Sequence, residues 1–150
     1  NVIPAEVTLQ LSVRALDRAV RGLLQTRITE LAQQQAASYG CTATVNYRPG
    51  YAVLVNTPAE TAFAREVAQA LVGPARTTLQ APALPGSEDF AFMLERVPGC
   101  YLLIGNGQTG DGGFAGHACM VHNPGYDFND ANVAVGAAYW ALLTERFLVP

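Results

Sequence analysis

Charge and histidine are scarce in this chain of 150 residues. Charged residues make up only 14% of it and there are two histidines, whereas 50% of the residues are hydrophobic. Nine basic residues against twelve acidic ones give a net charge of −3, without the basic surface that nucleic-acid-binding proteins carry. No apolar run reaches the roughly 18 residues that a membrane-spanning helix needs. We therefore expect a globular protein with neither nucleic acid nor a membrane as a partner.

Cysteine is also sparse, and its number is odd. Cys41, Cys100 and Cys119 lie far apart, whereas a disulfide framework normally uses an even number of cysteines. Scattered thiols suit a reducing compartment, so we expect a cytoplasmic protein without a signal peptide. The chain begins with Asn1 and enters a strand-like pattern almost at once, which favours a piece of a longer protein.

The first third of the sequence predicts a β-α-β unit. Hydrophobic and polar residues alternate over residues 6–15, as in a half-buried strand. Asp17 is a good N-cap for the long amphipathic helix that follows, and Gly40 is suited to end it. Alternation over residues 41–47 predicts a second strand. A single helix can cover only one face of so small a sheet.

Shorter elements follow a break in composition at Arg48-Pro49-Gly50. Thr57-Pro58-Ala59-Glu60 has the form of a capping box with proline at the first helical position, and Gly73-Pro74 would end that helix. Ser87 is expected to cap another helix, and Asn129-Asp130 to begin the last one. Strands are expected at residues 75–79 and, buried, at residues 100–104. The pattern predicts a mixed α/β fold.

One glycine-rich motif favours a nucleotide site at first sight. Gly105-Asn106-Gly107-Gln108-Thr109-Gly110 matches G-x-G-x-x-G and follows a predicted strand. In that fingerprint a helix begins inside the motif, so that its free N–H groups meet the pyrophosphate. Here Asp111-Gly112-Gly113 comes next, and glycine is about 1 kcal/mol worse than alanine in a helix. We interpret the segment as a loop that binds no nucleotide.

The two histidines lie close together in the sequence. His117, Cys119 and His122 have a spacing that zinc could use, but a closed structural site needs four ligands and no fourth is near. His122 differs in context, because the following Pro124 stiffens the backbone and Asp127 is near enough to accept a hydrogen bond from the ring. This pattern is typical of an imidazole held at the mouth of a cleft.

Two further segments allow a structural and a functional interpretation. Gly86-Ser87-Glu88-Asp89 places two carboxylates in a first helical turn, where they complement the helix dipole or take part in function. Ser87 lacks the G-x-S-x-G setting, so a serine-hydrolase nucleophile is not supported. Arg14 lies on the polar face of the first strand, where it is either solvated or, beside a cleft, able to bind a carboxylate.

Taken in order along the chain, these segments resemble one family. It is the family of metallo-amidohydrolases that includes hippurate hydrolase, indole-acetyl-amino-acid hydrolase and N-acyl-amino-acid amidohydrolase. The resemblance covers the whole chain and implies an α/β catalytic domain of the zinc-peptidase kind, with an inserted lid domain of ferredoxin-like topology. The segments that carry it are Asn1-Val2-Ile3-Pro4-Ala5 with Ser12-Val13-Arg14, Gly86-Ser87-Glu88-Asp89-Phe90, Pro98-Gly99, Ile104-Gly105, and the run His122 to Asp130.

The resemblance divides the chain near residue 50. Residues 1–50 match the second half of the lid and dimerisation domain, and residues 51–150 match the C-terminal part of the catalytic, metal-binding domain. The family's general-base glutamate, bridging carboxylate and other metal ligands belong to an N-terminal region that this sequence does not include. The resemblance therefore implies a chain that is inactive alone, and a homodimer or self-association through an unpaired sheet edge.

The resemblance also implies cofactors and roles for individual residues. Two divalent ions, usually zinc but also Mn, Co or Ni, would activate water and polarise the amide carbonyl of an N-acyl amino acid. His122 matches a metal ligand, with Asp127 in support, while Asn1 and Arg14 match positions that hold the substrate. The substrate side of the cleft matches Gly86 and Ser87, supported by Glu88. The alternative is a non-catalytic α/β binding or assembly module that kept the scaffold.

Overall fold

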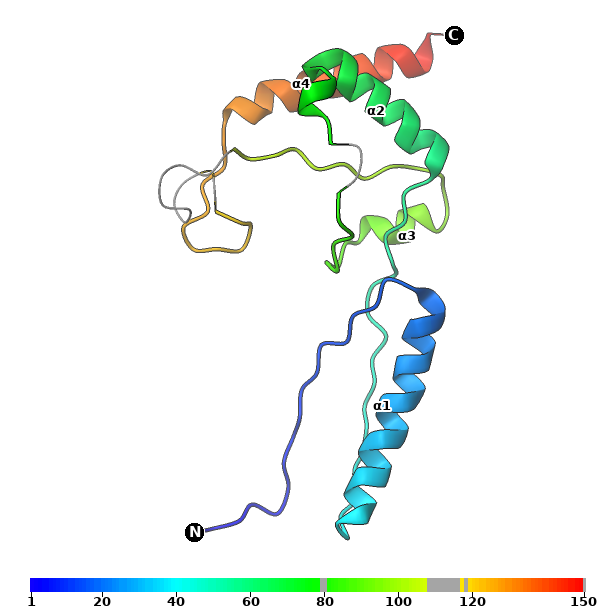
Figure 1. Cartoon of the computed structure of the whole chain (residues 1–150), viewed down its shortest axis with the longest axis vertical. Helices are drawn as coiled ribbons and strands as arrows, with labels where there is room; N and C mark the ends of the chain where they lie inside the picture. Colours follow the sequence, from blue (N-terminus) through cyan, green and yellow to red (C-terminus); the bar gives the residue numbers. More distant parts are fainter. Residues whose placement is uncertain (79–80, 108–116, 118, 150) are drawn as a thin grey trace. The chain divides into compact units, whose positions relative to one another are not determined.

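The computed structural model describes residues 1–78, 81–107, 117 and 119–149. The chain divides into a first unit, Asn1–Val55 with Pro82–Glu95, and a second unit, Asn56–Ala81 with Arg96–Pro150. The first change of unit comes close to residue 50, but residues 82–95 return to the first unit. Within the described residues the regular elements are four α-helices and one short 3₁₀ helix (Figure 1).

The first unit contains α1, the helix Arg18–Ser38. The carboxylate of Asp17 accepts a hydrogen bond of 2.8 Å from the backbone N–H of Val20, which satisfies a free donor of the first turn. At the other end Gly40 has a φ of 70°, a left-handed conformation that favours glycine. Both predicted ends of this helix are confirmed.

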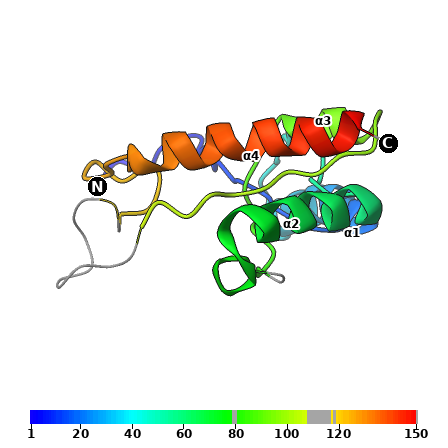
Figure 2. The same ribbon diagram turned by 90° about the horizontal axis from the view of Figure 1, so that it is seen from above.

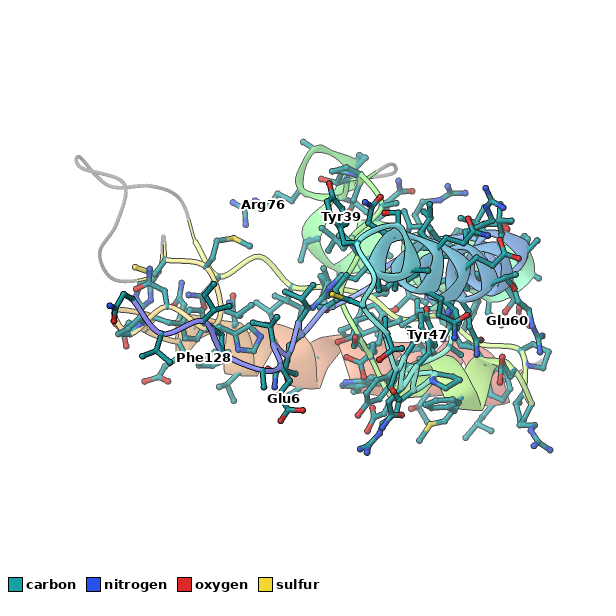
Figure 3. All side chains as sticks on the ribbon, turned by 90° about the horizontal axis from the view of Figure 1, so that it is seen from below. Glu6, Tyr39, Tyr47, Glu60, Arg76 and Phe128 are labelled. Atoms are coloured by element: carbon teal, nitrogen blue, oxygen red, sulfur yellow. The ribbon has the colours of Figure 1, made fainter. Side chains whose placement is uncertain are left out.

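Residues 41–50 run back along α1 (Figure 1). Ala43, Val45 and Tyr47 are half-buried while the residues between them are exposed, which is the predicted alternation. Figure 3 shows Tyr47 beside the helix, and the side chain of Arg21 donates a hydrogen bond of 3.3 Å to the carbonyl of Gly50. The apolar side of this segment is therefore covered by α1.

Residues 6–15, predicted as the first strand, pair with no neighbouring strand among the described residues. Val7 and Leu9 are each 84% exposed, so the hydrophobic face of residues 6–15 is not covered there. A strand is stabilised by pairing its backbone groups with a neighbour. The mixed α/β fold and the β-α-β lid consequently stay predictions.

The second unit is built around two helices, α2 (Pro58–Val72) and α4 (Ala131–Leu148), which lie side by side (Figure 2). Val67 is fully buried and Ala64 nearly so. The rings of Phe63 and Phe147 lie with their centroids 6.3 Å apart and extend the contact. These hydrophobic contacts hold the two helices together.

A tyrosine of α4 adds a polar contact to this helix pair. The hydroxyl of Tyr139 donates a hydrogen bond of 3.2 Å to the carbonyl of Ala64. Burial raises the pKa of the Tyr139 phenol above its usual 10.0, and electrostatic repulsion by Cys100 raises it further. The neutral phenol is thus the form that the fold favours.

The predicted ends of α2 are confirmed, but the predicted capping box is wrong. Thr57 is the N-cap and Pro58 the first helical residue, yet the Thr57 hydroxyl makes no capping hydrogen bond. It donates instead to the Gly99 carbonyl at 2.8 Å and accepts from the Gly99 N–H at 2.7 Å. Because both hydrogen bonds of the Thr57 hydroxyl are made with Gly99, this side chain joins the start of α2 to the segment before residue 100. Gly73, with a φ of 85°, ends the helix.

Two further predictions of local structure are wrong. Residues 75–79 were predicted as a strand, but η1, a 3₁₀ helix, covers Pro74–Arg76, and residue 79 lies outside the described part of the chain. The helix predicted to be capped by Ser87 is α3, Phe90–Leu94, and its N-cap is Asp89. Residues 82–88 are not helical, so the first turn of the helix begins at Phe90, three residues after Ser87.

Residues 101–104 are exposed rather than buried, and Cys100 is half-buried. Leu103 is 67% and Ile104 54% exposed. The side chain of Asn56 donates to the carbonyl of Tyr101 at 2.9 Å and accepts from its N–H at 2.8 Å. One carboxamide therefore occupies both backbone groups of Tyr101, as a neighbouring strand would. None of the helices in the described ranges is long and apolar enough to span a membrane.

Candidate functional site

The His122 loop, residues 119–127, leads into α4 in the second unit (Figure 1). His122 has a φ of 70°, and among the described non-glycine residues it alone has a positive φ. Such a conformation is uncommon for a side-chain-bearing residue, and strained residues of this kind cluster at functional sites. The His122 residue is exposed to solvent. The loop therefore presents its histidine outward on a strained backbone.

Two tight turns, one that contains His122 and one that follows it, fix this conformation. The N–H of Asn123 donates to the Met120 carbonyl at 3.2 Å, and the N–H of Tyr126 donates to the Asn123 carbonyl at 2.9 Å. The Asn123 side chain accepts a hydrogen bond of 2.8 Å from the Gly125 N–H, an arrangement that stabilises such turns. These bonds hold the backbone of His122 and of the residues that follow it.

The base of the loop is closed by contacts between His117 and Asp127. The His117 Nδ1 atom lies 3.1 Å from the Asp127 carbonyl oxygen and 3.8 Å from a carboxylate oxygen of the same residue. The Asn106 side-chain NH2 donates to the carbonyls of His117, at 3.1 Å, and Asp127, at 2.7 Å. Its oxygen accepts from the Asn129 N–H at 2.9 Å. One carboxamide thus joins His117, just before the loop, and Asp127, at its end, to Asn129, which lies two residues before α4.

The segment that carries Asn106 is held close to the loop. Gly107 has a φ of 151°, and a Cβ atom placed on it would lie only 2.9 Å from the Cβ of His117. The Asn132 side chain of α4 donates a hydrogen bond of 3.1 Å to the Gly105 carbonyl. Only a residue without a side chain fits at position 107 without displacing the base of the loop.

α4 begins where the sequence predicts it, directly after Asn129-Asp130. The side-chain oxygen of Asn129 accepts a hydrogen bond of 3.1 Å from the Ala131 N–H. Asp130 is the N-cap residue, but its side chain makes no capping hydrogen bond. Labelled in Figure 3, Phe128 lies between the loop and this helix and is half exposed.

The side chains of His117, Cys119 and His122, whose spacing was not expected to make a closed zinc site, are not gathered into one cluster in the described part of the chain. Cys119 is only 6% exposed, whereas His117 and His122 are both exposed, and Asp127 lies beside His117. No group of three or more His, Cys, Asp or Glu side chains able to hold a metal ion occurs in the described part of the chain. An exposed imidazole fits a divalent ion as one ligand, so His122 suits a site completed by other residues.

The predicted substrate-binding residues belong to the first unit. The Arg14 guanidinium donates a hydrogen bond of 2.5 Å to the carbonyl of Pro85, which directly precedes Gly86 and Ser87. The structure therefore brings Arg14 next to the Gly86-Ser87 segment, although 71 positions separate Arg14 from Pro85. The Glu88 carboxylate accepts a hydrogen bond of 3.3 Å from the Phe90 N–H and supports the start of α3.

Two further predicted features, Asn1 and the glycine-rich motif, are described by the structure only in part. Asn1 is exposed at the start of the first unit. Residues 108–116 of the glycine-rich loop lie outside the described residues, so the interpretation of that loop stays a prediction. The role of Asn106 could not be inferred from the sequence, since its partners are backbone groups 11, 21 and 23 positions away.

Comparison with known proteins identifies relatives along nearly the whole chain. Residues 5–146 match the model of peptidase family M20/M25/M40. The IAA-amino acid hydrolase ILR1-like 6 of Arabidopsis thaliana is 32% identical over 99% of this chain and 32% of its own length. The hippurate hydrolase of Campylobacter jejuni is 30% identical, over 99% of this chain and 36% of its own length.

A third relative is the N-acetyl-L-cysteine deacetylase of Bacillus subtilis, which is 28% identical over 99% of this chain and 33% of its own length. The chain thus spans about a third of the length of these curated relatives. No solved structure matches it. The family match covers most of the chain and agrees with the resemblance carried by the GSEDF and HNPGYDFND segments. This chain belongs to peptidase family M20/M25/M40.

Proposed function

We propose that this chain is the C-terminal part of a divalent-metal-dependent hydrolase that cleaves the amide bond of N-acyl amino acids. The observation that carries the proposal is the exposed His122, held with a φ of 70° in a closed loop of an M20-family chain. The names of the relatives supply the substrate class: an IAA-amino acid, hippurate and N-acetyl-L-cysteine are all acylated amino acids.

His122 is the residue of this chain that would hold a metal ion. An imidazole nitrogen is a good ligand for zinc and for manganese, cobalt or nickel, and two such ions are proposed for the whole protein. When bound, such ions polarise a carbonyl and lower the pKa of a coordinated water. The other ligands and the general-base glutamate would come from outside residues 1–150, so no catalytic residue is assigned within them.

Arg14 and the Gly86-Ser87 segment would bind the amino-acid end of the substrate. One guanidinium N–H is engaged by the Pro85 carbonyl, which orients the side chain and leaves other N–H groups for a carboxylate. Gly86 and Ser87 are exposed next to it and would line the substrate side, with Glu88 in support. Asn1 would contribute a further hydrogen bond to the substrate.

The proposal includes the domain arrangement expected from the sequence. Residues 1–50 would be the second half of a ferredoxin-like lid, and residues 51–150 the end of an α/β catalytic domain. The exposed Val7 and Leu9 suit a strand that pairs with a neighbour, either within the whole protein or in a homodimer. A cytoplasmic location agrees with the three free thiols.

The proposal is tested in the full-length protein that contains this chain. His122→Asn keeps a residue that tolerates a positive φ but removes the imidazole, so metal content should fall and hydrolysis of N-acetylcysteine and hippurate should cease. Metal content is measured by mass spectrometry and hydrolysis by release of the free amino acid. Arg27→Ala, an exposed substitution in α1, is the control and should change neither quantity.

Two results would contradict the proposal. Unchanged metal content and hydrolysis in His122→Asn would remove the ligand assignment. A full-length wild-type protein that binds no divalent metal and hydrolyses no acylated amino acid would favour the non-catalytic module instead. Residues 1–150 alone should bind zinc weakly and hydrolyse neither compound, because one imidazole offers too few ligands.

A further inference from the structure

Asn106 joins His117, just before the His122 loop, to Asp127 at its end, and His122 lies midway between these two residues in the sequence. The Asn106 NH2 donates to the carbonyls of His117, at 3.1 Å, and Asp127, at 2.7 Å, while its oxygen accepts from Asn129 at 2.9 Å. All the hydrogen-bonding groups of one short side chain are thereby used. We infer that Asn106 is a positioning residue, which holds His122 in the orientation that a divalent metal ion requires.

The arrangement of His122 itself makes such a residue necessary. Metal-binding histidines usually donate their second ring nitrogen to a carboxylate or carbonyl, which fixes the orientation of the ring. No such hydrogen bond of the His122 ring is found with the residues that the structure describes. Its orientation therefore depends on the backbone, which is strained at a φ of 70°. Closing the base of the loop restricts how that strain can relax.

Asparagine suits this position for a chemical reason. Two of its three partners are carbonyl oxygens and need a donor, while the third is an N–H and needs an acceptor. Aspartate could accept from Asn129 but would place a negative oxygen against the carbonyls of His117 and Asp127. Alanine would leave all three groups without this partner. The neighbouring Gly107 allows the carboxamide to approach, since its missing Cβ would meet His117 at 2.9 Å.

The inference rests on the proposed function, and its test is metal affinity rather than activity. In the full-length protein, Asn106→Ala should raise the dissociation constant for zinc by about 10-fold, the lower end of the effect of losing a group bonded directly to a ligand, because Asn106 acts on His122 through the backbone of the loop. Affinity is measured by competition with a chelator. Hydrogen exchange should show faster exchange of the Asn123 and Tyr126 amides.

Asn56→Ala provides a matched control. It also removes a carboxamide that makes side-chain hydrogen bonds to backbone groups, in this case those of Tyr101. It should lower thermal stability to a similar extent but leave zinc affinity unchanged. A loss of affinity that follows stability alone, equal in both variants, would overturn the inference.

A double variant separates positioning from general loosening. Asn106→Ala should weaken zinc binding no further in a protein that already carries His122→Asn, because its effect passes through His122. If Asn106→Ala weakens zinc binding by the same factor in the His122→Asn protein as in the wild type, the inference is overturned. If a folded Asn106→Ala protein keeps its zinc affinity while His122→Asn binds zinc more weakly, the inference is overturned. The proposed function is then unaffected. Unchanged affinity in His122→Asn overturns both.

A second perturbation covers the case in which Asn106→Ala does not fold. Gly107→Ala keeps every side chain of the cluster but places a Cβ atom 2.9 Å from the His117 Cβ, so the base of the loop must shift. Zinc affinity should fall in this variant although His122 and Asn106 are both present. Wild-type affinity in folded Gly107→Ala would overturn the inference.

Discussion

The contact between Thr57 and Gly99 allows a prediction that distinguishes two explanations of how the start of α2 is stabilised. Thr57→Val keeps the size of the side chain but removes a hydroxyl that donates to the Gly99 carbonyl and accepts from its N–H. Each such bond contributes about 1 kcal/mol to the free energy of unfolding, so the variant should lose about 2 kcal/mol. That is a large part of the ~5–15 kcal/mol by which a typical domain is stable.

The competing explanation is the capping box, in which the side chains of Thr57 and Glu60 satisfy free N–H groups of the first turn. It predicts that Glu60→Ala also costs about 1 kcal/mol. The structure predicts a loss within about 0.5 kcal/mol for this variant, as for most substitutions away from a specific contact. Thermal unfolding of the full-length variants, with hydrogen exchange at the Gly99 amide, measures the difference.

Thr57→Ser is the control, because it keeps the hydroxyl and should lose much less stability than Thr57→Val. Faster exchange of the Gly99 amide is expected in Thr57→Val but not in Glu60→Ala. Equal losses in Thr57→Val and Glu60→Ala, with the Gly99 amide still protected, would refute this reasoning and restore the capping box.

Two further predictions concern α1 and α4. The pKa of Tyr139 is raised in the folded state, so above pH 10 the folded state binds more protons than the unfolded state. The contribution of Tyr139 to stability is therefore complete below pH 10 and is lost as the pH rises through the pKa of the folded state. Tyr139→Phe should abolish this alkaline loss, which is measured by comparing the thermal stability of the two proteins as the pH rises above 10. Asp17→Ala should cost about 1 kcal/mol by removing the bond to the Val20 N–H, and Asp17→Ser should recover most of it. The exchange rate of the Val20 amide reports on this change, and a rate that is the same in wild type and Asp17→Ala would contradict it.

The sequence predicted the helices better than it predicted the extended segments. The start of α1 at Asp17 and the ends at Gly40 and Gly73 depend on bonds within a few residues, and all were found as expected. A strand depends on a partner that is distant in the sequence or outside it, so alternation over residues 6–15 could not establish pairing.

The candidate site shows the same limit. The sequence indicated His122, since a histidine before Asn-Pro in the HNPGYDFND segment resembles a known family. It also assigned Arg14 and the Gly86-Ser87 segment to one cleft, and the structure places them together through Pro85. It gave no signal for Asn106, which was considered only as part of a glycine-rich motif. A side chain whose partners are backbone carbonyls leaves no pattern of residue types to detect.

The return of residues 82–95 to the first unit affects how the protein is made. The chain changes unit after Val55, after Ala81 and after Glu95, so neither unit is a continuous stretch of sequence. During synthesis the first unit stays incomplete until the ribosome has passed residue 95, by which time the residues of α2 in the second unit have already been added to the chain. A truncation at one point therefore yields neither unit free of residues that belong to the other. Isolating the second unit would require joining Asn56–Ala81 directly to Arg96–Pro150.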